Sequence, residues 1–270
     1  MKVVLADIDE KALAKVEQEL KDAGASLLAV RMDVSKPDDV EALAQKTLDA
    51  FGAVHLLFNN AGVASVTTLW EASLADWQWV MGVNLWGVIH GVRTFVPIML
   101  KEDVECHVVN TASMAGLISG PCLGIYKVTK HGVVALSEVL ACELALIDAK
   151  VKVSVLCPAW VNTKIADSER NRPCELQDAF ESKTTHPTTL QLKEALQQFV
   201  EGGIPSSEVA SAVFDAIRKE RFYILTHADW KPLLQKRMED ILQEHNPQSI
   251  LRTGPGSDEA PIEAVGRARN

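Results

Sequence analysis

The chain has 270 residues, of which 47% are hydrophobic and 23% are charged. This is a globular composition, which excludes a disordered, collagen-like or coiled-coil protein. Its 27 basic and 36 acidic residues give a formal net charge of −9, the wrong sign for a protein that binds the phosphate backbone of nucleic acid.

The five cysteines form no CxxC pair and have no zinc-type spacing with histidine, so we expect reduced thiols, no disulfide framework and no metal site. The apolar run before Asp7 is too short for the core of a signal peptide, and no uncharged stretch is long enough to span a membrane. These features predict a soluble cytoplasmic protein without a membrane partner.

Short β-rich runs alternate with amphipathic helices along the chain, and this alternation predicts an α/β fold whose parallel sheet is covered by helices on both faces. The expected strands are Val3 to Ala6, Ser26 to Met32, Val54 to Phe58, His107 to Asn110, Val151 to Cys157 and Phe222 to Leu225. The expected helices are Asp9 to Ala23, one from Ser35 to Phe51, Leu74 to about Leu100, Ile125 to Ile147, Leu190 to Val200, Ser206 to Lys219 and Asp229 to about His245.

Two helix starts are predicted from their residues. Ser35 stands before Pro37 and is the expected N-cap of its helix, and Ser73 with Asp76 three residues later resembles a capping box.

Composition changes little along the chain, which indicates one domain over residues 1–250. Residues 162–187 are polar, irregular and contain proline, and we expect the segment 162–205 to be a lid over a substrate. Residues 251–270 have no hydrophobic period, and we expect them to be a disordered tail.

The most informative cluster is Ser113, Tyr126 and Lys130. A spacing of four puts Tyr126 and Lys130 on one face of a helix, where the ammonium is expected to lower the phenol's pKa and make Tyr126 a general acid or base. Ser113, at the end of a strand, could hold a substrate oxygen. The alternative is a Tyr and a Lys on a solvated helix face.

Together with that cluster, a set of motifs in order along the chain resembles the short-chain dehydrogenase/reductase family. The set comprises Asn59-Asn60-Ala61-Gly62, Asn84, Ser113, Tyr126-x-x-x-Lys130 and the run Pro158 to Thr163. The resemblance covers about residues 1–245 and implies a Rossmann-like, doubly wound sheet and a nicotinamide cofactor.

The resemblance also implies a role for each matching residue. Tyr126 would exchange a proton with the substrate oxygen, Lys130 would bind the nicotinamide ribose, and Ser113 would orient the substrate. Asn84 would hold a water of the proton relay at a local irregularity of its helix. The cofactor would be lined by Asn60, Ala61, Gly62 and Pro158, with Asp33 and Val34 beside the adenine and Val161 and Thr163 at the carboxamide.

Several of these residues have structural alternatives. Asn60 and Gly62 could form only a turn, Asp33 could cap a strand end, and Asn84 could be one polar residue on a helix face.

Asp7 follows the first strand, where a carboxylate can accept the ribose hydroxyls of NAD and repel the 2′-phosphate of NADP. No arginine stands beside Asp7, so the sequence favours NAD over NADP.

The chain departs from the family pattern at its start. No stretch has the spacing G-x-x-x-G-x-G, and the strand that carries this turn in the family lies in the middle of the sheet. We therefore expect either that Met1 is an internal residue of a longer protein, or that Val3 to Ala6 pairs directly with Val54 to Phe58. A smaller departure is Ala159, where the family has glycine.

The residues expected to face the substrate are apolar, which indicates a hydrophobic secondary alcohol or ketone. They are Met114, Leu117, Leu123 and Trp160. The two long apolar helices resemble those through which family members form dimers and tetramers, so a homo-oligomer is expected. The competing hypothesis is a non-catalytic binding or interaction protein of the same fold, because the phosphate-binding turn is absent.

Overall fold

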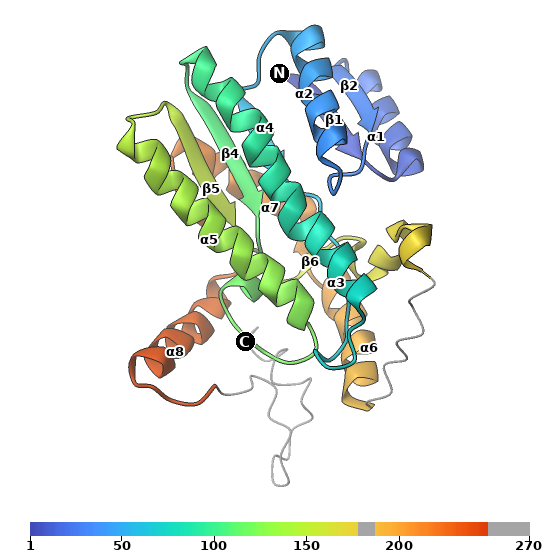
Figure 1. Cartoon of the computed structure of the whole chain (residues 1–270), viewed down its shortest axis with the longest axis vertical. Helices are drawn as coiled ribbons and strands as arrows, with labels where there is room; N and C mark the ends of the chain where they lie inside the picture. The colour runs from blue at the N-terminus through green and yellow to red at the C-terminus, as the bar shows by residue number, and fades with distance from the viewer. Residues whose placement is uncertain (178–186, 248–270) are drawn as a thin grey trace.

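The structure, a computed structural model, describes residues 1–177 and 187–247 (Figure 1). Its first unit is a two-stranded parallel sheet with two helices. The strands are β1 (Lys2–Asp7) and β2 (Ser26–Arg31), and the helices are α1 (Glu10–Asp22) and α2 (Pro37–Phe51).

The two helices differ in how their N-termini are capped. The Asp9 carboxylate caps α1 by accepting a hydrogen bond from the Ala12 N–H at 3.0 Å. The prediction that Ser35 caps α2 is wrong: Lys36 is the N-cap residue, and the Ser35 hydroxyl donates to Asp33 Oδ1 at 2.7 Å. The nearby Asp33 carboxylate competes successfully for this hydroxyl, and Pro37 fixes the first turn of the helix without a side-chain cap.

The main sheet has four parallel strands in the order β3, β4, β5, β8. They are β3 (Leu56–Asn59), β4 (Cys106–Thr111), β5 (Val151–Leu156) and β8 (Tyr223–Ile224). Because β4 and β5 lie inside the sheet, their apolar side chains are buried on both faces, as in other parallel sheets covered by helices.

Helices cover both faces of this sheet, as predicted. Val108 and Val153 pack against α4 (Gly87–Glu102) and α5 (Gly124–Leu146), which lie in front of β4 and β5 in Figure 1. On the other face, Val109 and Leu156 pack against α7 (Ser206–Arg218).

The two sheets are separate in the described part of the chain: β1 pairs with β2, β3 pairs with β4, and no ladder joins β1 to β3. The predicted pairing of Val3 to Ala6 with Val54 to Phe58 is therefore wrong, and β3 itself begins only at Leu56. Side-chain packing joins the units instead, because Met32 and Val40 of the first unit lie in the same buried cluster as Met99.

The predicted helix from Leu74 to about Leu100 is present with an irregularity in its middle. It consists of α3 (Leu74–Met81), a π-helical turn (Gly82–Trp86) and α4. The capping box is confirmed: Ser73 Oγ accepts from the Asp76 N–H at 3.1 Å and Asp76 Oδ2 accepts from the Ser73 N–H at 2.9 Å. Residues 74–102 are long and apolar enough to cross a membrane by length and composition alone, and 44% of their most apolar window is buried inside the protein.

The predicted lid starts and ends on a short parallel pair, β6 (Val161–Asn162) and β7 (Ile204–Pro205). Between these strands lie two 3₁₀ segments, Ile165–Asn171 and Cys174–Leu176, and α6 (Pro187–Glu201). Residues 178–186 of the lid and the predicted tail at 251–270 lie outside the described residues. A 3₁₀ turn (Ala228–Trp230) and α8 (Lys231–Leu242) complete the described elements.

Candidate active site

The carboxyl ends of β3 and β4 bring the predicted site residues to one edge of the main sheet. The register pairs Asn59 with Asn110, and their side chains are linked by a hydrogen bond of 2.8 Å from Asn59 Nδ2 to Asn110 Oδ1. Asn110 in turn donates to the Ser137 hydroxyl of α5 at 2.9 Å. This buried polar chain ties both strand ends to the helix that carries Tyr126 and Lys130.

Ser113 follows the end of β4 and is buried. Its hydroxyl donates to the Pro158 carbonyl at 3.2 Å and accepts from the Ala115 N–H at 3.1 Å. Ser113 is thus joined directly to the loop after β5, which carries the predicted cofactor residues Pro158, Val161 and Thr163.

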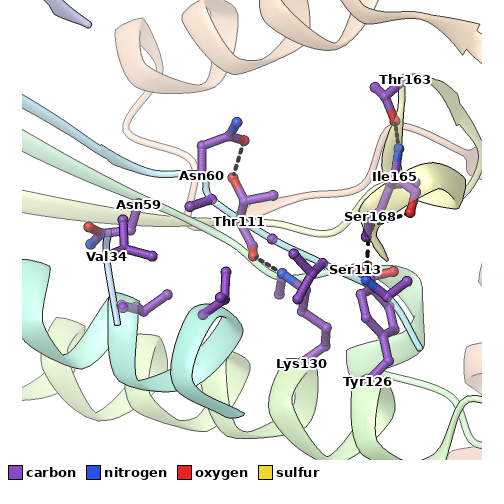
Figure 2. A pocket seen from close by; sticks show the side chains of 18 of the residues that line it. Val34, Asn59, Asn60, Thr111, Ser113, Tyr126, Lys130, Thr163, Ile165 and Ser168 are labelled. Atoms are coloured by element: carbon purple, nitrogen blue, oxygen red, sulfur yellow. Dashed lines mark hydrogen bonds between the residues drawn. The ribbon is translucent and has the colours of Figure 1, made fainter. Parts of the chain in front are cut away.

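Tyr126 and Lys130 lie on one face of α5, as their spacing predicts, and both extend toward the end of β4 (Figure 2). The Lys130 ammonium lies 5.6 Å from the centre of the Tyr126 ring and donates to the Thr111 carbonyl at 2.8 Å. The Lys130 residue is only 2% exposed, so the alternative of a Tyr and a Lys on a solvated face is wrong.

The sequence predicts that the pKa of Tyr126 is lowered, and this prediction is wrong. Burial raises the pKa of Tyr126 to about 12, and a hydrogen bond with the Ser113 hydroxyl only partly opposes this effect. Burial also lowers the pKa of Lys130, to about 8. Desolvation disfavours the charged form of both groups, and at Tyr126 it outweighs the neighbouring hydroxyl.

Asn84 lies in the π-helical turn, so the expected irregularity of its helix is confirmed. Its side chain is fully buried: Oδ1 accepts from the Val63 N–H at 2.8 Å, and Nδ2 donates to the Val63 carbonyl and the Thr129 hydroxyl. Both amide hydrogens of Asn84 therefore bind protein oxygens and join the loop after β3 to α5. The predicted water of the proton relay is not tested by these contacts.

One cavity of about 1430 Å³ connects the predicted residues. Its wall includes every predicted cofactor, substrate and catalytic residue except Asn84 and Leu117. The first unit and the segment that joins its β2 to α2 contribute Asp7, Asp33 and Val34 to this wall. The other predicted residues that line the cavity are Asn60, Ala61, Gly62, Ser113, Met114, Leu123, Tyr126, Lys130, Pro158, Trp160, Val161 and Thr163.

The donors and acceptors of this cavity fit a nicotinamide dinucleotide. Within the described residues, the only hydrogen-bond partner of the Lys130 ammonium is the Thr111 carbonyl, which leaves two of its three hydrogens for ribose hydroxyls. A Cβ at Gly62 would lie 3.6 Å from both Lys130 Nζ and Asn84 Oδ1, so the glycine leaves space for a ligand beside the ammonium. In the first unit, Asp7 contributes to the wall a carboxylate that can accept ribose hydroxyls.

The sequence analysis missed His227, which follows β8 at the same edge of the sheet. Its Nδ1 accepts from the Ala159 N–H at 3.1 Å, and its Nε2 lies 3.1 Å from the Trp160 carbonyl oxygen. His227 thus holds the same loop after β5 that Ser113 contacts through Pro158. The available signal was a polar residue two positions after the predicted strand Phe222 to Leu225.

Two arginines of the lid, Arg170 and Arg172, were also missed. Arg170 lines the cavity, and Arg172 forms an ion pair with Asp76 of α3. Arg170 also lies 3.8 Å from a carboxylate oxygen of Asp9. Both ion pairs join residues about 100 or more positions apart, so no local sequence pattern predicts them.

Comparison with known proteins gives a consistent result. A model of the short chain dehydrogenase family matches residues 1–173. The chain is also similar to a solved short chain dehydrogenase/reductase from Burkholderia phymatum in complex with NAD, with 48% identity and a TM-score of 0.90. That alignment covers 94% of this chain and 89% of the other.

Two curated proteins are similar at lower identity. One is a CLA biosynthesis dehydrogenase/reductase from Lactiplantibacillus plantarum, 32% identical over 254 residues, which are 94% of this chain and 89% of that protein. The other is a 1-deoxy-11-beta-hydroxypentalenate dehydrogenase from Streptomyces exfoliatus, 30% identical over 241 residues, covering 88% and 78% of the two chains.

Proposed function

The chain belongs to the short-chain dehydrogenase family, and from this we propose that it is an oxidoreductase that transfers a hydride between NAD and a hydrophobic secondary alcohol or ketone. The observation that carries the proposal is the convergence of Ser113, Tyr126 and Lys130 on one cavity at the carboxyl edge of the sheet. A chain without catalysis has no physical need to bury an ammonium beside a phenol and a hydroxyl.

In reduction of a ketone, Tyr126 donates its proton to the carbonyl oxygen while Ser113 holds that oxygen by a hydrogen bond. With a pKa raised to about 12, Tyr126 carries this proton at neutral pH. The hydride for this reduction would come from reduced NAD held in the cavity. In oxidation of an alcohol the same proton returns to the Tyr126 phenolate.

Lys130 has two roles in this proposal. Its free hydrogens bind the ribose hydroxyls next to the nicotinamide, and its positive charge favours the phenolate form of Tyr126 during oxidation. Asn84 keeps the loop after β3 against α5 through Val63 and Thr129, so it positions the cofactor wall formed by Asn60, Ala61 and Gly62.

NAD is favoured over NADP for two reasons. Asp7 ends β1 with a carboxylate that would repel a 2′-phosphate, and the similar Burkholderia phymatum protein was solved with NAD. Asp33 and Val34 would lie beside the adenine, and Val161 and Thr163 beside the carboxamide.

The substrate end of the cavity is apolar and aromatic. Met114 and Leu123 line it, and the Trp160 ring stacks on Phe199 with 5.2 Å between ring centres. Such walls favour a substrate whose carbon skeleton is hydrophobic, in line with the hydroxypentalenate named for the Streptomyces exfoliatus relative.

A homo-oligomer is part of the proposal because α5 exposes apolar side chains away from the sheet. Val128 is 47% exposed, Val139 55% and Leu146 84%. A second copy that covers this face would remove that surface from water. Light scattering of the purified chain would give twice or four times its mass of 29.5 kDa.

A second candidate function is a non-catalytic binding protein of the same fold. Two observations favour it: the given sequence contains no G-x-x-x-G-x-G spacing, and the described strands of β1 to β5 and β8 form two sheets that are not hydrogen-bonded to each other.

Calorimetric titration of the 270-residue chain with NAD separates the two candidates. Micromolar binding, together with formation of NADH from hydrophobic secondary alcohols, supports the oxidoreductase. If the folded chain binds NAD at micromolar concentration but turns over no alcohol or ketone, the binding protein is favoured. If it binds no NAD at all, this chain by itself is not the oxidoreductase.

A further inference from the structure

The cavity wall contains a lysine to which the proposed function gives no role. Lys127 directly follows Tyr126 on α5, is partly buried and lines the same cavity. Its main-chain N–H donates to the Leu123 carbonyl at 2.8 Å, at the start of the helix. A helical side chain lies over the turn that precedes its own residue, so the Lys127 stem extends toward Leu123, one of the apolar residues expected to face the substrate.

The ammonium of Lys127 has no hydrogen-bond or ion-pair partner among the described residues. Burial lowers the pKa of Lys127 to about 8, and no carboxylate opposes this effect. None of the carboxylates that line the cavity forms an ion pair with it; these are Asp7, Asp9, Asp33 and Glu175. Lys127 therefore brings an uncompensated positive charge to the cavity wall at neutral pH.

A second cation acts on the same part of α5. His131 lies one turn after Lys127, and its Nδ1 is 2.9 Å from the Lys127 carbonyl oxygen. Burial lowers the pKa of His131, and the charges of Arg237 of α8 and of Lys127 lower it further. The main chain of Ala115, which lines the cavity two residues after Ser113, acts on His131 in the opposite direction. This places the face of α5 that carries Lys127 next to the segment that follows Ser113, in surroundings of positive charge.

Burial of an ammonium without a counter-charge costs free energy, which a bound anion can offset. The structural alternative is a lysine whose stem covers apolar surface while its ammonium stays in water. An ammonium in full contact with water keeps its ordinary pKa, which is 10.5 for lysine. The lowered pKa of Lys127 therefore favours an ammonium that faces the cavity and is completed by a ligand.

A carboxylate on a hydrocarbon is the anion that fits this wall. Met114, Leu123 and Trp160 line the cavity with apolar and aromatic groups, which favour a carbon skeleton over a phosphorylated sugar. Neighbouring residues of a helix point about 100° apart, so Tyr126 and Lys127 reach different points of the wall. The negative charge that meets Lys127 is therefore separated by several carbons from the oxygen that meets Tyr126.

We propose that Lys127 binds a carboxylate of the substrate, and that the substrate is a hydrophobic hydroxy acid or keto acid whose carboxylate lies several carbons from the reacting carbon. The inference deepens the proposed function and rests on it for the identity of the reacting group. Tyr126 and Ser113 act on the oxygen of the hydroxyl or ketone, and Lys127 holds the carboxylate. The ammonium exchanges no proton with the reacting oxygen, so its contribution is to substrate affinity and specificity.

Hydroxydecanoates with the hydroxyl at each position from the third to the ninth carbon test this inference, each beside its methyl ester. The ester keeps the carbon skeleton and removes the negative charge. We expect the wild-type chain to oxidise at least one acid with a kcat/KM about tenfold to a hundredfold above that of its ester, the range for hydrogen bonds to charged groups. The difference should lie mainly in KM, because Lys127 acts on binding.

Two substitutions separate the charge of Lys127 from its size. Lys127→Met keeps an unbranched side chain without charge, and the ratio of kcat/KM for acid and ester should fall to about one. Lys127→Arg keeps the charge and should keep most of the preference for the acid. Lys152→Met is the matched control, because Lys152 lies 4.0 Å from Glu220 with a side chain that is 50% exposed, and it is not part of the cavity wall. It should leave the preference unchanged.

Calorimetric titration with decanoate adds a measurement that needs no turnover, and thermal unfolding shows whether each variant is folded. We expect decanoate to bind to wild type and to Lys127→Arg, and to bind more weakly to Lys127→Met by the same factor as the loss of preference. Binding that is restored by arginine cannot be explained by a folding defect of the methionine variant.

The outcomes separate this inference from the proposed function. If the wild-type chain oxidises alcohols but uses acid and ester equally, or if Lys127→Met keeps the preference for the acid or its affinity for decanoate, the role of Lys127 is overturned and the oxidoreductase remains. If decanoate binding depends on Lys127 but no hydroxy acid, alcohol or ketone is turned over, the carboxylate site stands and the oxidoreductase fails. A wild-type chain that binds no decanoate and turns over none of these compounds overturns both.

Discussion

The guanidinium of Arg172 lies 2.8 Å from a carboxylate oxygen of Asp76, and the two side chains are only 1% and 7% exposed. Arg172 belongs to the lid. Asp76 lies in the first turn of α3, where it forms the capping box with the N-cap residue Ser73. The guanidinium also lies 5.0 Å from the centre of the Trp79 ring. This buried pair therefore fixes the lid to the helix whose π-helical turn carries Asn84.

Removing one partner of a buried ion pair leaves the other charge without compensation. We expect Arg172→Met to lower the free energy of unfolding by about 3–5 kcal/mol, measured by urea denaturation. Arg93→Met breaks the exposed pair with Glu41 and should cost less than about 1 kcal/mol. Equal losses in the two variants would show that burial does not strengthen the Arg172 contact.

Tyr126→Phe should lower the turnover rate by about 10²- to 10⁴-fold, the usual contribution of a general acid or base. Binding of NAD, followed by calorimetry, should change only slightly because the ring remains. The control is Tyr223→Phe, which removes the hydroxyl that donates to Glu138 at 2.6 Å at a 44% exposed residue, and it should leave turnover unchanged. A Tyr126→Phe enzyme that keeps a tenth of the wild-type rate would exclude Tyr126 from its proposed role.

The lowered pKa of Lys130 predicts a dependence of stability on pH. Its pKa is about 8 in the folded chain and 10.5 in the unfolded reference, so between these values the unfolded state binds more protons. The Lys130 contribution to the free energy of unfolding therefore rises with pH in this window, by up to about 1.4 kcal/mol per pH unit.

The effect is measured as a difference between wild type and Lys130→Met. Tyr126 and Cys157 have raised pKa values of about 12, so the comparison is made below pH 10, where both groups keep their protons. A difference that stays constant from pH 7 to pH 10 would mean that Lys130 keeps its proton in the folded chain.

Alanine substitutions at two glycines should have different effects on stability and on NAD binding. A Cβ at Gly116 would lie 2.5 Å from the Lys130 carbonyl oxygen, a main-chain atom that can move only with α5, so Gly116→Ala should lower the free energy of unfolding by about 1–3 kcal/mol. At Gly62 the nearest atoms are 3.6 Å away. Gly62→Ala should keep stability within about 0.5 kcal/mol but weaken NAD binding, because its methyl group fills space beside Lys130.

Thermal unfolding and NAD titration of these two variants give the comparison. Unchanged NAD affinity in Gly62→Ala would show that the cofactor does not approach this part of the cavity wall.

Asp7→Ser should change the choice of cofactor. Loss of the carboxylate removes hydrogen bonds to the ribose hydroxyls and the repulsion of a 2′-phosphate, so the preference for NAD over NADP should fall by about tenfold or more. The ratio of the dissociation constants for NADP and NAD measures this preference. An unchanged ratio would show that residues other than Asp7 discriminate between the two cofactors.

The order of helices and strands, the capping box of Ser73 and Asp76, and the shared face of Tyr126 and Lys130 could all be predicted from the sequence. These features depend on hydrophobic period, on side chains that bond main-chain groups three residues away, and on the 3.6-residue turn of a helix. Each of them is determined within a few neighbouring residues.

Only the tertiary structure decided the pKa of Tyr126, the division of the strands into two sheets, and the roles of Arg170, Arg172 and His227. Burial depends on every element that packs around a side chain, so the spacing of Tyr126 and Lys130 could not reveal that desolvation raises the pKa of the phenol. The ion pairs of the lid join residues about 100 or more positions apart, such as Asp76 with Arg172 and Asp9 with Arg170. Contacts of this kind exist only once the chain has folded, because no local preference brings their partners together.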